Sequence, residues 1–284
     1  MHGVHTALVT PFAADGSVDL DAYARLAQRQ LDAGVHGLVP CGTTGETPTL
    51  SEDEWAACIG VAVQVAGGSV PVTAGIGSNN TALAVQQAKQ ARELGVTAGL
   101  MAFPWYNKPN PEGHRRHLDA VLSAGLPIVL YHVPGRTGQR LSSKLLGELA
   151  NRDGVIGVKE ATGDLRYVSE LLRFTDTAVL SGDDFTFLAA LAVGGTGVIS
   201  VVSNVDPEGT VAVYDAFRRG DLEDARRRNL ALLDLVDYLF EDSNPVPCKA
   251  AMAAMGLCNE RMRLPLAEGD PAGAVPVLER LGLL

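Results

Sequence analysis

The sequence predicts a (β/α)8 barrel followed by a small helical region. Eight short runs of mostly apolar residues recur along the chain, at residues 5–10, 37–41, 71–76, 98–103, 127–132, 155–159, 178–181 and 196–202. Each run is followed by a segment in which apolar residues recur with the helical period. Runs that are apolar on both faces and joined through helices are typical of a parallel sheet covered by helices. Eight such units in about 220 residues indicate a closed barrel.

The helical segments carry the residues expected at helix ends. Ser51 and Glu54 form the Ser-x-x-Glu pattern of a capping box, which predicts a helix start at residue 51. Gly34, Gly95 and Gly125 follow other segments, where glycine commonly terminates a helix. We therefore expect barrel helices at residues 20–32, 51–66, 79–94, 111–124, 142–151, 164–174, 185–193 and 207–219.

After Gly220 the alternation stops and only helical segments remain, at residues 221–240, 246–255 and 272–281. Prolines at positions 245, 247, 265 and 271 are expected to break this region into separate helices. The sequence therefore predicts a catalytic barrel at 1–222 and a C-terminal helical region at 223–284. An open doubly wound sheet is the rival architecture, but its G-x-G-x-x-G fingerprint is missing after the first run.

Composition argues against several classes of function. Of the 284 residues, 46% are hydrophobic and 20% are charged, which is typical of a globular enzyme. The formal net charge of -10 argues against a nucleic-acid partner, because phosphate binding needs clustered Lys and Arg. No apolar run approaches the roughly 18 residues of a membrane span, and no signal-peptide pattern opens the sequence. The four cysteines fall in no Cys-x-x-Cys or Cys/His ligand spacing, so we expect reduced thiols and a cytoplasmic protein.

Lys159 is the residue around which the chemistry is predicted. It closes the run at 155–159, and in a barrel the active site lies at the carboxyl ends of the strands. Partial burial of an amine disfavours its ammonium form, and a neutral amine can attack a ketone. The alternative for such a residue is a lysine whose ammonium group simply extends from a strand end into solvent.

Residues at the ends of three other runs complete the predicted rim. The glycines and hydroxyls of Gly42-Thr43-Thr44-Gly45-Glu46 suit a ligand carboxylate, although an ordinary Gly/Thr turn has the same composition. Tyr106 and Tyr131 are phenols that transfer protons when a neighbouring group tunes them, and that otherwise anchor the edges of a core. Arg136 lies in a glycine-flanked loop and can clamp a carboxylate with two hydrogen bonds.

Several motifs follow one another in the order and spacing of a known family. They are GTTGE at 42–46, Y-x-VPGRTG at 131–138, GVKEATG at 157–163, LSGDD at 180–184 and GVISV at 197–201. Together they resemble the dihydrodipicolinate synthase family. NPVPCK at 244–249 and LPL at 264–266 resemble the C-terminal helical region of the same family, so the resemblance runs nearly end to end.

The resemblance implies a lyase of lysine and diaminopimelate biosynthesis that condenses pyruvate with L-aspartate 4-semialdehyde. Lys159 would form a Schiff base with pyruvate, and the derived enamine would attack the aldehyde. No metal and no cofactor beyond this covalent lysine imine is implied. By the same resemblance Tyr131 donates and accepts the proton at the imine, while Thr43 and Tyr106 complete a hydroxyl relay to solvent.

The resemblance also implies the residues that bind substrate. Thr44, with the backbone of the loop that begins at Gly42, would hold the pyruvate carboxylate, and the Ile199 backbone would line the pyruvate site. Arg136 would receive the carboxylate of the aldehyde substrate. Because the family is typically a homotetramer built from two tight dimers, Tyr106 is expected to reach the site of a neighbouring subunit.

Three alternative functions remain open. An N-acetylneuraminate lyase or a 2-keto-3-deoxy sugar acid aldolase of the same superfamily would share Lys159 and Tyr131, but Arg136 favours the synthase. The GGTG stretch at 194–197 could mimic the phosphate loop of a barrel isomerase. A catalytically silent homologue is the third, but it would have no physical need for the lysine, the threonine and both tyrosines.

Two further groups of residues are predicted to bind no ligand. Trp55 and Leu83 occupy the positions of a His and a Glu that bind feedback lysine in inhibited members of the family, so weak or absent lysine inhibition is expected. His114 and His117 are spaced as helix neighbours but have no convergent acid, so a solvated helix face is expected rather than a metal site.

Overall fold

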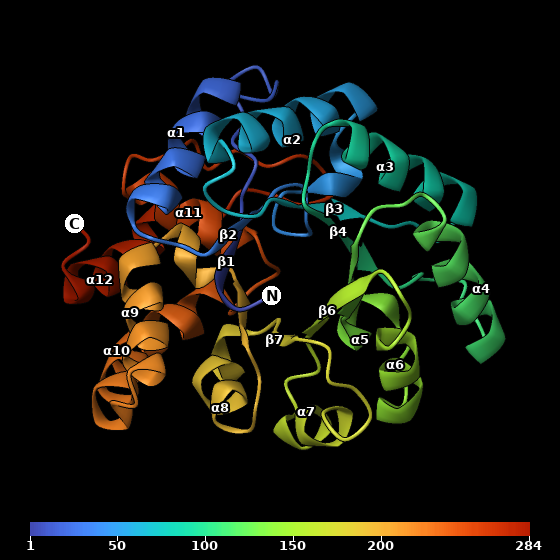
Figure 1. Ribbon diagram of the computed structural model, residues 1–284. Helices are drawn as coiled ribbons and strands as arrows, with labels where there is room; N and C mark the ends of the chain where they lie inside the picture. Colours follow the sequence, from blue (N-terminus) through green and yellow to red (C-terminus); the bar gives the residue numbers. More distant parts are fainter.

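The computed structural model describes residues 1–284 and is a closed barrel of eight parallel strands surrounded by helices (Figure 1). The strands are β1 Gly3–Ala7, β2 Gly37–Val39, β3 Thr73–Ile76, β4 Ala98–Ala102, β5 Ile128–His132, β6 Val155–Glu160, β7 Val179–Ser181 and β8 Gly197–Ser200. They pair in the order β2-β1-β8-β7-β6-β5-β4-β3. A parallel bridge between Leu38 and Val72 joins β2 to the start of β3 and closes the ring. The predicted (β/α)8 fold is confirmed.

Helices connect the strands and cover the outside of the barrel (Figure 1). They are α1 Leu20–Asp32, α2 Glu52–Ala66, α3 Thr81–Glu93, α4 Pro111–Leu122, α5 Pro134–Thr137, α6 Ser143–Ala150, α7 Leu165–Leu171, α8 Phe187–Ala192, α9 Pro207–Arg218, α10 Leu222–Leu239, α11 Val246–Ala254 and α12 Pro271–Leu281. Short 3-10 turns occur at η1 Thr47–Thr49, η2 Asp184–Thr186 and η3 Val202–Asn204. Each predicted helical segment corresponds to one helix, whereas α5 and the 3-10 turns are too short to show a periodic pattern.

The predicted helix ends are largely confirmed. The Glu54 N–H donates to Ser51 Oγ at 3.2 Å and the Ser51 N–H donates to Glu54 Oε2 at 2.9 Å, which completes the capping box. Two of the four prolines do not break a helix as predicted. Pro247 lies in the first turn of α11 and Pro271 is the first residue of α12, where a missing N–H costs no helical hydrogen bond.

The first strand lies further toward the N-terminus than predicted. It spans Gly3–Ala7 rather than residues 5–10, because the chain leaves the sheet after Leu8. The Val9 N–H donates to the side-chain oxygen of Asn204 at 3.3 Å instead of to a neighbouring strand. Gly3, whose φ is 91°, has no strand propensity to mark the true start.

Two hydrophobic clusters lie on the two faces of the sheet. A cluster of 43 buried residues joins strand residues such as Leu130 and Val158 to the surrounding helices. A second cluster of 8 buried residues contains the alternate strand positions, among them Val129, Tyr131 and Ile199. Because side chains alternate across a strand, the second cluster fills the inside of the barrel.

The C-terminal helices pack against the barrel through a third cluster of 14 buried residues. This cluster joins barrel residues, including Val9 and Val201, to Leu235 of α10, Met252 of α11 and Leu278 of α12. The two regions therefore share a core, and a division at residue 222 stays a prediction. Figure 1 shows α9 and α10 lying side by side, with α12 next to them.

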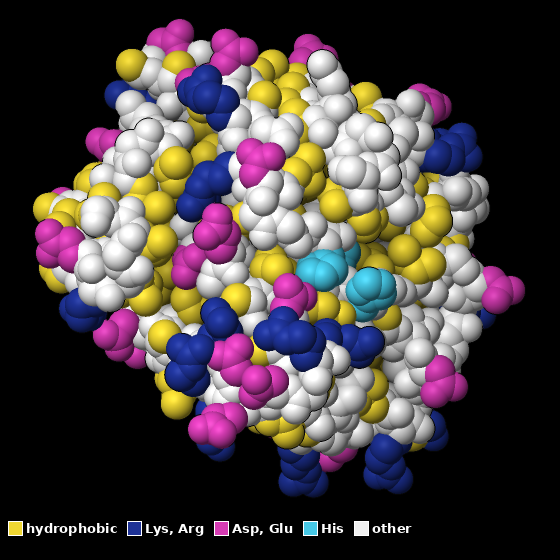
Figure 2. Space-filling view, turned by 60° about the vertical axis from the view of Figure 1, so that its left-hand side comes forward, with side chains coloured by type: hydrophobic (Ala, Val, Ile, Leu, Met, Phe, Trp, Pro, Cys, Tyr) yellow, Lys and Arg dark blue, Asp and Glu magenta, His cyan; other side chains and the backbone are white.

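The surface carries charges of both signs. Figure 2 shows Lys and Arg side chains interspersed with Asp and Glu over one face, with no extended basic region. None of the helices is long and apolar enough to span a bilayer.

Candidate active site

Lys159 and Tyr131 face each other on neighbouring strands inside the barrel. Tyr131 of β5 is the direct register partner of Lys159 of β6. Tyr131 belongs to the inner cluster, and Val158, the neighbour of Lys159, belongs to the outer one, so Lys159 also points inward. The Lys159 Nζ lies 4.3 Å from the centroid of the Tyr131 ring, and only 5% of the lysine is exposed. The sequence prediction that these two residues meet at the carboxyl end of the barrel is therefore consistent with the structure.

The amine of Lys159 has no hydrogen-bond or ion-pair partner in the protein beyond the face of Tyr131. Lys249, the other buried lysine, differs: its Nζ lies 2.8 Å from Glu46 Oε1 and also donates to two backbone carbonyls. A nitrogen whose protons are all engaged cannot act as a nucleophile, so of the two buried lysines only Lys159 is poised for covalent chemistry.

Gly182 creates the space for the Lys159 side chain. A Cβ placed on Gly182, just after β7, would lie 2.9 Å from Lys159 Cγ and 3.0 Å from Lys159 Cε. The glycine therefore allows the lysine stem to cross the end of β7. The sequence analysis placed Gly182 in a family motif but gave it no role, because the contact joins residues from different strands.

The 42–46 loop, Gly42 to Glu46, follows β2 and reaches the same end of the barrel. Thr44 is buried, and its hydroxyl accepts a hydrogen bond of 2.9 Å from the side-chain amide of Asn244. The backbone carbonyl of Asn244 accepts a hydrogen bond of 3.1 Å from Nη2 of the exposed Arg136. Asn244 thus connects the two predicted carboxylate-binding residues, and it comes from the C-terminal region, 200 residues from Thr44.

The remaining predicted residues lie around this centre. Ile199 of β8 is fully buried and shares the inner cluster with Tyr131. Gly42 has open space where a side chain would be, which leaves its backbone accessible to a ligand. Thr43 is half-buried, and its carbonyl accepts the Glu46 N–H at 3.0 Å. All three lie at or next to the carboxyl end of a strand.

Tyr106 lies apart from the other predicted residues in the isolated chain. It is 88% exposed, has a φ of 70°, and its hydroxyl forms no hydrogen bond with Thr43 or Tyr131. A left-handed backbone at a large aromatic residue is uncommon and is often functional. The single chain therefore does not assemble the hydroxyl relay that the resemblance implies.

Acidic residues after β7 shape the electrostatics of the rim. Burial raises the pKa of Asp183, and the charge of Glu160 adds to this effect while Lys159 opposes it. Burial also raises the pKa of Asp184. Its carboxylate accepts hydrogen bonds from Ser200 Oγ at 2.6 Å and from the Val201 N–H at 2.9 Å. Asp184 thereby fixes the end of β8, where Ile199 lies.

One sequence expectation is wrong, and one of the open alternatives loses its support. His114 and His117 are buried rather than solvated; His114 bonds to Gln139 and His117 to Thr81. The GGTG stretch at 194–197 joins α8 to β8, so it lies at the amino end of the strand, opposite Lys159. Phosphate loops of barrel enzymes lie at the carboxyl end, and this stretch therefore gives no support to a phosphate-binding isomerase.

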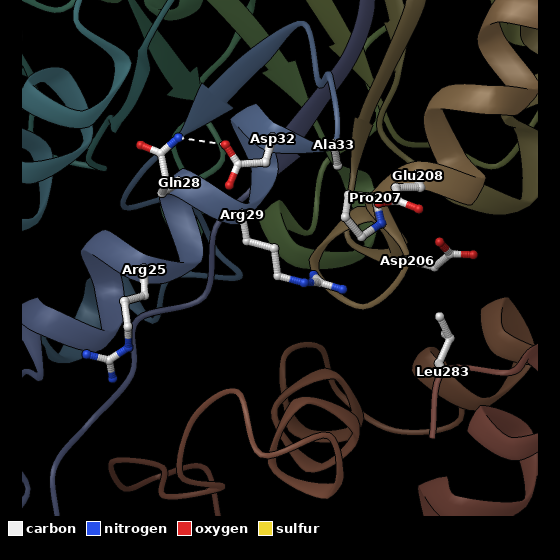
Figure 3. A pocket seen from close by; sticks show the side chains of 9 residues that line it. All are labelled: Arg25, Gln28, Arg29, Asp32, Ala33, Asp206, Pro207, Glu208 and Leu283. Atoms are coloured by element: carbon white, nitrogen blue, oxygen red, sulfur yellow. Dashed lines mark hydrogen bonds between the residues drawn. The ribbon is translucent and has the colours of Figure 1, made fainter.

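A cavity of about 400 Å³ lies elsewhere, between α1, the start of α9 and the C-terminal residues (Figure 3). Figure 3 shows the Arg29 side chain extending toward Asp206 and Glu208. The guanidinium of Arg29 donates to the carbonyls of Asn204 and Val205, each at 2.8 Å. None of the predicted site residues lines this cavity, and its Arg29 anchors the end of η3.

A (β/α)8 barrel with an unpaired lysine facing a tyrosine at its carboxyl end has the fold and site of an aldolase-type lyase. Comparison with known proteins gives the family. The model of the dihydrodipicolinate synthetase family matches residues 1–273, and the chain belongs to this family. Members of the family are pyruvate-dependent lyases.

Individual relatives match over nearly their whole length. The 4-hydroxy-tetrahydrodipicolinate synthase of Pelobacter propionicus is 44% identical over 99% of each chain. The crystal structure of dihydrodipicolinate synthase from Thermotoga maritima is 38% identical, with a TM-score of 0.97 over 100% of this chain and 99% of that one. A monomeric dihydrodipicolinate synthase variant is also 38% identical, with a TM-score of 0.97 over 100% of this chain and 98% of that chain.

Proposed function

We propose that the chain is a 4-hydroxy-tetrahydrodipicolinate synthase that condenses pyruvate with L-aspartate 4-semialdehyde. Membership of the family supports this proposal, and the free amine of Lys159 beside Tyr131 is the observation that carries the chemistry. The product serves the biosynthesis of lysine and diaminopimelate. The four free cysteines and the absence of any step that needs a metal fit a cytoplasmic enzyme that works through a lysine imine alone.

The first half of the reaction activates pyruvate. The neutral amine of Lys159 attacks the ketone carbon, and the ketone oxygen leaves as water to give an imine. The protonated imine withdraws electrons, so the methyl group of pyruvate loses a proton and becomes an enamine. Tyr131 stands next to the nitrogen and moves protons to and from these intermediates.

The second half forms the carbon–carbon bond and releases the product. The enamine carbon attacks the aldehyde carbon of aspartate semialdehyde, and the aldehyde oxygen takes up a proton to become a hydroxyl. The substrate amine then attacks the imine carbon, closes the ring and expels the amine of Lys159, which is regenerated. No oxidant or reductant is consumed in this sequence.

Two carboxylates must be held while this happens. Thr44 and the backbone from Gly42 hold the carboxylate of pyruvate, and the backbone of Ile199 lines that site. Arg136 receives the carboxylate of the aldehyde. Asn244 bonds to both Thr44 and Arg136, so it sets the separation between the two carboxylate sites.

Turnover by the purified protein tests the proposal. Pyruvate with aspartate semialdehyde is expected to give rapid consumption of the aldehyde, whereas N-acetylneuraminate and 2-keto-3-deoxy sugar acids are expected to remain uncleaved. Arg136→Ala should raise the KM for the aldehyde by about 10-fold or more, because a charge-assisted bond is lost. Cleavage of a sugar acid with no condensation would contradict the proposed substrate.

The assembly is proposed to be a tetramer made of two tight dimers, in which Tyr106 completes the hydroxyl relay of the neighbouring subunit. The exposure of Tyr106 and its left-handed backbone support this placement. Sedimentation gives the mass of the assembly. Mixing inactive Tyr106→Phe and Lys159→Ala subunits should restore activity, because a mixed dimer has one site with both residues; no restoration would contradict a shared site.

A further inference from the structure

A buried ion pair lies directly behind the 42–46 loop. The Lys249 Nζ of α11 contacts Glu46 Oε1 at 2.8 Å, donates to the Thr10 carbonyl at 3.0 Å and to the Arg261 carbonyl at 2.5 Å. It also lies 4.3 Å from the centroid of the Phe12 ring. Neither side chain is exposed beyond 1%. The three protons of the Lys249 ammonium therefore have three acceptors, and the Glu46 carboxylate balances its charge.

Glu46 is the last residue of the 42–46 loop, so its bond to Lys249 holds the loop backbone. Its backbone is left-handed, with a φ of 53°, a conformation that is unfavourable for a residue with a side chain unless its surroundings hold it. Its second carboxylate oxygen accepts the Arg263 N–H at 3.2 Å. The preceding residue, Gly45, is held as well, because its carbonyl accepts the Thr10 hydroxyl at 2.8 Å. The loop end is thus fixed by Thr10, in the segment after β1, and by the C-terminal region together.

We propose that Lys249 and Glu46 are positioning residues, which hold the 42–46 loop so that Thr44 and the loop N–H groups meet the pyruvate carboxylate. The proposal rests on the proposed function of that loop. Neither side chain reaches the substrate, since both are sealed beneath the loop. The consequence is that the C-terminal region is part of the binding site, through the contact of Lys249 with Glu46 and that of Asn244 with Thr44.

An ion pair that only stabilises the fold would affect the melting temperature but not the binding of pyruvate. The chain offers a control in Glu54 and Arg263, which form a partly buried ion pair at 2.5 Å on the same C-terminal segment. The Arg263 guanidinium lies over the same Phe12 ring, at 4.5 Å. Glu54 belongs to α2 and touches no residue of the 42–46 loop through a hydrogen bond. Glu54→Gln therefore removes an ion pair of the Arg263 side chain, while the Lys249–Glu46 pair and the bond from the Arg263 backbone N–H to Glu46 stay in place.

The measured quantity is the pyruvate concentration that half-saturates borohydride trapping. Glu46→Gln should raise this concentration by about 10-fold or more, because a neutral amide no longer balances Lys249 and the loop relaxes. The KM for aspartate semialdehyde and the rate at saturating pyruvate should change by less than about 3-fold. Glu54→Gln should lower the melting temperature while leaving half-saturation within about 2-fold of the wild type.

The double variant Glu46→Gln with Lys249→Met keeps the test possible if Glu46→Gln alone does not fold. A neutral pair restores much of the stability in a buried site, yet half-saturation should stay raised because the directed bonds to the loop are gone. The proposal would be overturned if the folded Glu46→Gln variant, or the double variant, had the same half-saturating pyruvate concentration as the wild type. Failure of the wild-type protein itself to form a pyruvate adduct would instead count against the proposed function.

Discussion

Residue type alone does not decide reactivity in this protein, and its two buried lysines demonstrate the point. Lys159 and Lys249 are both almost inaccessible to solvent. The ammonium of Lys249 is saturated by Glu46 and two carbonyls, whereas the amine of Lys159 faces only an aromatic ring. Burial lowers the pKa of Lys249 and the charge of Glu46 opposes that shift, but every proton of its ammonium is engaged. The amine of Lys159 is left free to bond to carbon.

Tyr131→Phe tests the role of the phenol without changing the packing of the ring. The value of kcat should fall by about 100- to 10,000-fold, the range for loss of a general acid–base group, while pyruvate should still be trapped on the enzyme. Steady-state kinetics and trapping measure the two effects separately. Tyr167→Phe is the control, because its hydroxyl bonds only to the Leu141 carbonyl at 2.9 Å. An equal loss of kcat in both variants would contradict a catalytic role for Tyr131.

At the scale of elements, the ends of the four strands β5 to β8 constrain the site. β5 and β6 place Tyr131 and Lys159 in register, Gly182 just after β7 clears the lysine stem, and β8 is held by Asp184. No single βα unit contains the site. This explains why short loops and 3-10 turns at these ends matter more to function than the covering helices do.

Gly182→Ala should impair catalysis more than folding. The added methyl group meets Ala161 Cβ at 2.8 Å and Lys159 Cγ at 2.9 Å, so both neighbours must move; we expect kcat to fall by about 10- to 100-fold and stability by about 1–3 kcal/mol. Kinetics with urea unfolding would measure both. Gly60→Ala in α2, where no atom lies within 4 Å, should keep full activity. Unchanged kcat in the Gly182 variant would contradict the proposed steric role.

His5, in the middle of β1, should make the stability of the folded protein depend on pH. Burial lowers the pKa of His5 from 6.5 to about 4. Below pH 6.5 the unfolded chain binds a proton at His5 that the folded protein rejects, so this contribution to stability is complete above pH 6.5 and is lost as the pH falls to about 4. The loss is about 3 kcal/mol at most. His5→Asn should reduce the change of the urea-unfolding midpoint with pH over this range. A variant whose midpoint changes with pH as much as that of the wild type would contradict this role of His5.

At the scale of the whole molecule, the barrel could be predicted from the sequence because strand and helix patterns are local. The residues near 159, 131 and 42–46 could be placed at one rim because parallel strands end together. Asn244, Lys249 and Gly182 could not be assigned roles, since their contacts join distant parts of the chain. The two helical histidines were misjudged for a similar reason: burial of His114 against Phe103 is a tertiary contact that spacing does not reveal.

Regulation by lysine should be weak or absent. The indole N–H of Trp55 is buried and donates to the Gly75 carbonyl at 3.0 Å, and Leu83 is apolar and 36% exposed. Neither residue can pair with the ammonium or carboxylate groups of free lysine. Initial rates should therefore stay constant when millimolar lysine is added at subsaturating pyruvate. Dose-dependent inhibition would contradict this expectation and would locate binding groups elsewhere on the chain.

The central claim is that Lys159 forms the covalent bond to pyruvate. Borohydride reduction in the presence of pyruvate, followed by mass spectrometry of the intact protein and its peptides, tests it directly. We predict one reduced pyruvate adduct per chain, on the peptide that contains Lys159, and no adduct in a folded Lys159→Arg variant, whose turnover should be at least about 1000-fold slower. An adduct on another lysine, or turnover in the wild type without any adduct, would contradict the mechanism.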